Sequence, residues 1–127
     1  MSVESRVLVG LTIEFAKDLD HEDFKKAEAF TEKYPELDEY RYSSWDREGK
    51  LLLVGDGMNG SFLRLIKVDK YIDDAHLGES NEFFELAAPP TAFDPDLLVK
   101  MTTLYEEYTG KPATLSDIKY AMWSQAY

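Results

Sequence analysis

The sequence contains no cysteine, so thiol catalysis, zinc–thiolate centres and disulfide bonds are excluded together. This absence suits a reducing compartment, and we expect a cytoplasmic protein. Runs of about 20 apolar residues are also lacking, which predicts that no segment spans a membrane. The opening residues 1–6 include Glu4 and lack both the basic region and the apolar stretch of a signal peptide.

Positive charge is scarce, with 14 Lys and Arg against 25 Asp and Glu and a net charge of −11. No Lys or Arg occurs between Lys70 and Lys100. The same segment carries seven acids, which are Asp73, Asp74, Glu79, Glu82, Glu85, Asp94 and Asp96. Such a field repels nucleic-acid phosphate and anionic membranes, and it attracts a basic protein surface or a cation.

Two elements are predicted at the start of the chain. Residues 6–15 alternate, with the odd-numbered apolar positions from Val7 to Phe15 on one face, which predicts a half-buried strand. Asp20 is a suitable N-cap for an amphipathic helix that ends before Pro35.

The middle of the chain predicts a three-strand antiparallel meander. Residues 40–45 alternate between aromatic and polar types, and residues 46–49 offer turn chemistry before the apolar run 51–54. A second turn at 55–60 leads into a long strand at 61–72.

Toward the end of the chain we predict a short strand and two consecutive helices. The strand spans 82–86, and the first helix begins after Asp94 and stops at Gly110. The last helix opens at Thr114, where Asp117 completes a pattern resembling a capping box. With 127 residues, the chain is expected to form one α+β domain, residues 1–127, in the order β-α-β-β-β-(β)-α-α, with helices packed on a largely antiparallel sheet.

A glycine pattern, G-x-G-x-x-G, occupies Gly55, Gly57 and Gly60. In a dinucleotide fold the third glycine opens a helix, whereas here a strand-like run follows, so we interpret the pattern as a turn without nucleotide affinity. No cofactor is therefore predicted.

Potential metal ligands gather at Asp73, Asp74, His76 and Glu79. Carboxylates on a bent loop suit a hard cation, but the spacing fits neither an EF-hand nor a hydrolytic zinc site. These residues are weak metal candidates, and a solvated acidic loop is the favoured interpretation.

The predicted last helix has two apolar sides. Leu115, Ile118, Met122 and Ala126 form one side, and Tyr120, Trp123 and Tyr127 form the other. A helix wedged between the sheet and its neighbour explains this pattern. Alternatively, the aromatic side is part of an interface, because Tyr and Trp are enriched at binding hot spots.

No residue set specifies a reaction, and a non-enzymatic protein is favoured. We expect a small acidic binding protein of the inhibitor, immunity or anti-defence type. It would occupy a basic surface of a partner protein, and a surface that otherwise binds nucleic acid is one such target. The predicted interface combines the seven acids of 71–99 with Tyr120, Trp123 and Tyr127. Direct binding to nucleic acid or membranes is not expected. The alternative is an α+β domain that binds a small molecule or metal ion in a lidded pocket.

Overall fold

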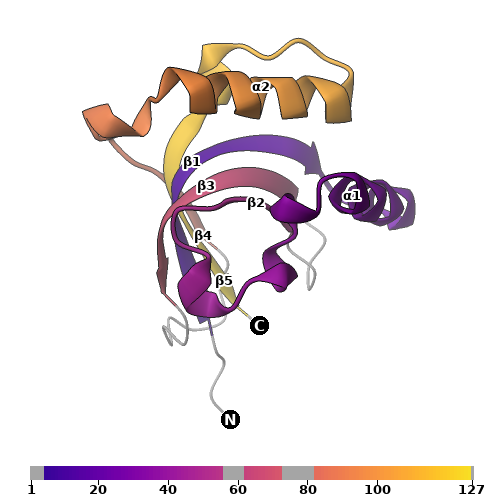
Figure 1. Ribbon diagram of the computed structural model, residues 1–127, viewed down its shortest axis with the longest axis horizontal. Helices are drawn as coiled ribbons and strands as arrows, with labels where there is room; N and C mark the ends of the chain where they lie inside the picture. Colours follow the sequence, from indigo (N-terminus) through magenta and orange to yellow (C-terminus); the bar gives the residue numbers. More distant parts are fainter. Residues whose placement is uncertain (1–4, 56–61, 73–81, 127) are drawn as a thin grey trace.

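The computed structural model describes residues 5–55, 62–72 and 82–126, and it confirms the α+β class. The strands are β1 (Ser5–Lys17), β2 (Leu51–Gly55), β3 (Phe62–Ile72), β4 (Glu82–Glu85) and β5 (Lys119–Ala126). They form one antiparallel sheet in the order β2-β3-β1-β5-β4, accompanied by the helices α1 (His21–Lys33) and α2 (Pro95–Thr109). Figure 1 shows that the sheet is strongly curved, with α2 over its convex side.

The central strand β1 is buried on both faces, so the prediction of a half-buried strand is wrong. Leu11, Ile13 and Phe15 join the core beneath the helices, whereas Leu8 joins a second cluster on the opposite face with Trp123. The sheet is curved enough for the side chains on its concave face to pack against one another, and they form the second cluster. Helices that cover the other face do not account for this burial. Even the polar residue Thr12 is only 1% exposed.

Residues 40–45 do not form the predicted strand. The chain instead makes three short 3-10 turns, η1 (Pro35–Leu37), η2 (Glu39–Arg41) and η3 (Ser44–Asp46). Polar contacts explain the difference, because Asp38 caps η2 and Glu39 forms a bidentate ion pair with Arg6 at 2.8 and 3.1 Å. These contacts anchor the turns to β1 and overrule the alternating pattern. The other strand pair of the predicted meander is confirmed, since β2 and β3 pair antiparallel from Leu51↔Lys67 to Gly55↔Leu63.

The helices predicted after Asp20 and after Asp94 are both confirmed. Asp20 forms a capping box with Asp23 at the start of α1. Asp94 caps α2, and Gly110 ends it in the left-handed conformation with φ 71°. The buried side of α2 packs against the core cluster through Met101, Leu104 and Tyr108. No helix in the described parts of the chain is long and apolar enough to cross a membrane.

The prediction of a second C-terminal helix is wrong. The capping box of Thr114 and Asp117 forms, but it opens only the 3-10 turn η5 (Leu115–Asp117). The chain then continues as β5, which fills the position between β1 and β4. Pairing on both sides overrides the helix-forming residues of this segment. The observed order is therefore β-α-β-β-β-α-β, and the short strand predicted at 82–86 is present as β4.

Candidate functional site

Of the acidic residues of 71–99 that the structure describes, Asp94 and Asp96 line one depression with Lys67 and Lys100, whereas Glu85 lies apart from it. Asp94 caps α2, Asp96 lies in its first turn, and Glu85 on β4 forms an ion pair with Lys119 at 3.3 Å. The weak metal candidates Asp73, Asp74, His76 and Glu79 lie outside the described residues, as do Tyr127 and the side chain of Glu82. Among the residues that are described, no group of three or more His, Asp and Glu side chains could hold a metal ion.

Trp123 lies in the core of the sheet. Its side chain is 1% exposed and packs against Phe62, with the ring centroids 4.7 Å apart. Tyr120, on the opposite side of β5, is partly buried against the helix-covered core. The expected grouping of Tyr120 with Trp123 is therefore wrong, because in the strand Tyr120 shares a face with Ile118 and Trp123 lies on the opposite face. In this conformation the Trp123 indole offers no surface to a partner.

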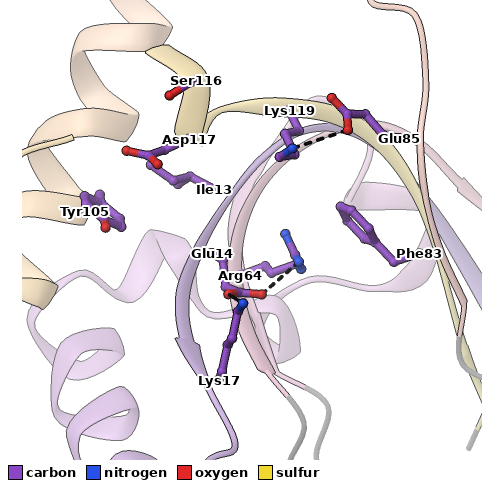
Figure 2. Close-up of a pocket in the computed structure, with 10 residues that line it drawn as sticks. All are labelled: Ile13, Glu14, Lys17, Arg64, Phe83, Glu85, Tyr105, Ser116, Asp117 and Lys119. Atoms are coloured by element: carbon purple, nitrogen blue, oxygen red, sulfur yellow. Dashed lines mark hydrogen bonds and ion pairs between the residues drawn. The ribbon is translucent and has the colours of Figure 1, made fainter. Parts of the chain in front are cut away.

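A charged hollow of about 530 Å³ lies where β1 extends beyond the start of β5 (Figure 2). Arg64 is held at its centre by Glu14, at 2.9 Å, and by the Phe83 ring, whose centroid is 4.0 Å from the guanidinium carbon. Burial lowers the pKa of Arg64, and the charge of Glu14 partly offsets this effect. The buried Arg64 Nε has no hydrogen-bond partner among the described residues.

Among its described lining residues, the hollow offers no recognisable activated nucleophile. Its positive groups, Lys17, Arg64 and Lys119, are matched by Glu14 and Glu85 in ion pairs, and Asp117 is engaged in the capping box of η5. The Ser116 hydroxyl is hydrogen-bonded to Thr114 at 2.7 Å. Because the charges of its described lining residues balance, these residues give the hollow little electrostatic preference for an ion of either sign.

A different surface combines apolar and acidic character. We call it the α1–β2 groove, a depression of about 390 Å³ between α1, η2 and the β2–β3 hairpin. Its apolar lining consists of Leu19, Phe24, Ala27, Leu53 and Leu63, with Tyr40 beside them. Two of these side chains are unusually open, since Phe24 is 41% and Tyr40 80% exposed.

The charges around this groove are of one sign. Glu28, Asp38 and Glu39 are its only charged lining residues among those described. Glu39 forms an ion pair with Arg6, but no described Lys or Arg forms an ion pair with Glu28 or Asp38. The charge of Glu39 also raises the pKa of Tyr40 above its ordinary value.

The acidic rim continues into a neighbouring depression. This second depression shares Glu28, Thr31 and Asp38 with the groove and adds Glu32. Arg41 is its only described basic residue. Glu28 and Glu32 lie four positions apart on α1 and therefore face the same side, about 6 Å apart along the helix axis. A row of carboxylates thus borders an apolar floor.

The sequence predictions missed this groove. They offered aromatic residues at the end of the chain as one candidate interface, whereas Tyr40 and Trp45, on η2 and η3, are the most exposed of the large hydrophobic side chains that the structure describes. A usable signal was present in the acidic outer positions of the helix after Asp20, such as Glu28 and Glu32. The expectation of a strand at 40–45 did not place Tyr40 next to this helix.

Comparisons with protein-family models, with curated proteins and with solved structures found no match to this chain. Function is therefore inferred from its own residues.

Proposed function

We propose that this protein is a non-enzymatic acidic binding protein that occupies a basic surface of a partner protein through the α1–β2 groove. One observation carries the proposal. The groove joins an apolar floor and the exposed rings of Phe24 and Tyr40 to two carboxylates, Glu28 and Asp38, that form no ion pair with a described Lys or Arg. Exposed apolar surface rimmed by charge is typical of a protein-binding site, because burial supplies affinity and charge supplies specificity and association rate.

The charge of the whole chain supports this choice of partner. A net charge of −11 steers basic surfaces toward the protein and opposes phosphate. An inhibitor that covers a nucleic-acid-binding site of its partner is one form of this function. The carboxylates should also speed association with a basic partner, because electrostatic steering can raise association rates by one to three orders of magnitude at low salt.

The test uses the intact protein immobilised to capture partners from a lysate of its source cells, with elution by increasing NaCl. We expect the captured proteins to be basic and to be released as the NaCl concentration rises. Glu28→Gln together with Glu32→Gln should weaken capture about three- to thirtyfold, since each exposed ion pair contributes up to about 1 kcal/mol. Affinities of captured proteins are then measured at low and high salt.

A matched double variant, Glu85→Gln with Asp96→Asn, removes the same charge from the 71–99 segment. It should leave capture nearly unchanged if the groove is the interface. Loss of binding in this variant, with normal binding of the groove variant, would move the interface to the acidic segment. Captured proteins that resist both variants and high salt would contradict the proposal.

The alternative function is small-molecule binding in the charged hollow, and the observation that favours it is a volume of about 530 Å³ lined by side chains of both charges. A ligand with both a carboxylate and an ammonium group would suit its mixed charges. Isothermal titration with free amino acids tests this alternative, with Arg64→Gln as the control. Saturable heat that disappears in the variant would favour the hollow over the groove.

A further inference from the structure

The shape of the α1–β2 groove narrows the class of partner. We infer that it binds a short protein segment in which one bulky apolar side chain is flanked by Lys or Arg. This inference rests on the proposed function and specifies how the same site recognises its partner. It requires that the apolar floor, and not charge alone, determines affinity.

The floor has room for such an anchor. Its volume of about 390 Å³ exceeds twice the roughly 150 Å³ of an apolar cavity that accommodates benzene. Leu53 and Leu63 come from paired strands and are 5% and 4% exposed, so the bottom of the groove is rigid core. Phe24 and Tyr40 add ring surface at the opening. A Phe or Leu side chain inserted here would be covered on several sides.

The rim determines what must flank the anchor. Glu28 and Asp38 line the groove itself, and Glu32 follows on the next turn of α1. Carboxylates about 6 Å apart along a helix match basic side chains spaced by one turn of a partner helix, or by alternate residues of an extended segment. A segment without positive charge would leave Glu28 and Asp38 facing apolar surface with reduced hydration, which disfavours binding.

Two fluorescent peptides test the inference by fluorescence anisotropy with the intact protein. One is a short lysine-rich peptide with a central Phe, and the other is identical except for Ser in place of Phe. We expect the Phe peptide to bind about ten- to a hundredfold more tightly, the equivalent of burying one large apolar side chain. Both affinities should fall as NaCl increases.

A pair of variants on one helix locates the binding site. Ala27 lines the floor, whereas Ala29 is exposed on α1 and does not line the groove. Ala27→Gln should abolish the advantage of the Phe peptide and retain the weaker binding of the Ser peptide, whereas Ala29→Gln should change neither. Phe24→Ala provides a second variant of the apolar lining, at the opening of the groove, if thermal melting shows that Ala27→Gln is unfolded.

The outcomes separate this inference from the proposed function. Equal binding of both peptides by the parent protein would overturn the apolar anchor and leave an electrostatic interface intact. Identical effects of Ala27→Gln and Ala29→Gln would place the anchor outside the groove and also overturn the inference. Absence of salt-dependent binding by either peptide would count against the proposed function itself.

Discussion

Thr12 carries a hydroxyl group that no described residue satisfies, although its side chain is 1% exposed. A buried polar atom without a partner costs about 1–3 kcal/mol of folding free energy. Thr12→Val replaces this hydroxyl with a methyl group of similar size. We expect Thr12→Val to leave the free energy of unfolding unchanged or raise it by about 1 kcal/mol, as measured by urea denaturation.

Thr12→Asp is the opposing substitution at the same position. It buries an unpaired carboxylate and should lower the free energy of unfolding by several kcal/mol, or prevent folding. If Thr12→Val were instead the more harmful change, the hydroxyl would have a structural role that the described contacts do not provide.

The two buried faces of β1 show why residue alternation was only partly informative. Alternating apolar positions correctly predicted the face formed by Leu11, Ile13 and Phe15. The other face includes Gly10 and Thr12, and neither residue type predicts a core position. Gly10 is required there, because a Cβ atom would lie 1.7 Å from the Lys67 carbonyl oxygen. This constraint arises from a neighbouring strand distant in sequence, which a local pattern does not contain.

At the scale of elements, local signals succeeded where they determine structure locally. Asp20, Asp94 and Gly110 mark helix ends through contacts with the next few residues, and all three were identified from sequence. Residues 119–126 became a strand because β1 and β4 lie on either side of it. The candidate groove was missed for a related reason, since α1, η2 and the β2–β3 hairpin meet only in the folded chain.

The two helices are tied together by a contact that should depend on pH. Glu107 on α2 accepts hydrogen bonds from Lys33 and from the Tyr34 hydroxyl, the latter at 2.5 Å. Hydrogen bonding from Lys33 is the largest cause of the lowered pKa of Glu107, and it also raises the pKa of Lys33. A lowered carboxyl pKa stabilises the fold above the ordinary value of 4.5, and this contribution is lost as pH falls through the folded pKa.

Glu107→Gln should therefore lower the melting temperature at pH 7, and the difference from the parent should shrink between pH 5 and pH 3. The raised pKa of Lys33 keeps the contact intact below its ordinary value of 10.5, so little change is expected between pH 6 and pH 9. Melting curves across this range provide the measurement. A difference that stays constant down to pH 3 would assign the effect of Gln to packing and not to charge.

At the scale of the whole molecule, the net charge of −11 has opposite effects on binding and stability. Surplus carboxylates attract a basic partner, but they repel one another in the folded protein. The groove concentrates this conflict, because Glu28 and Glu32 are like charges four residues apart on α1, an arrangement that destabilises a helix by about 0.2–0.5 kcal/mol. An acidic rim that served only solubility would not need to border an apolar floor.

The variant that weakens binding should consequently stabilise the free protein. We expect Glu28→Gln with Glu32→Gln to raise the melting temperature by about 1–3 °C at low salt, because the substitutions remove local and long-range repulsion. At about 1 M NaCl the Debye length falls to about 3 Å, and the gain should nearly disappear. Glu85→Gln with Asp96→Asn should give a smaller gain, since it also removes the ion pair with Lys119. Calorimetry at both salt concentrations tests this trade-off.

A groove variant that melts at a lower temperature than the parent would mean that these carboxylates stabilise the fold. A gain in stability accompanied by loss of binding is instead the behaviour of residues placed for a partner.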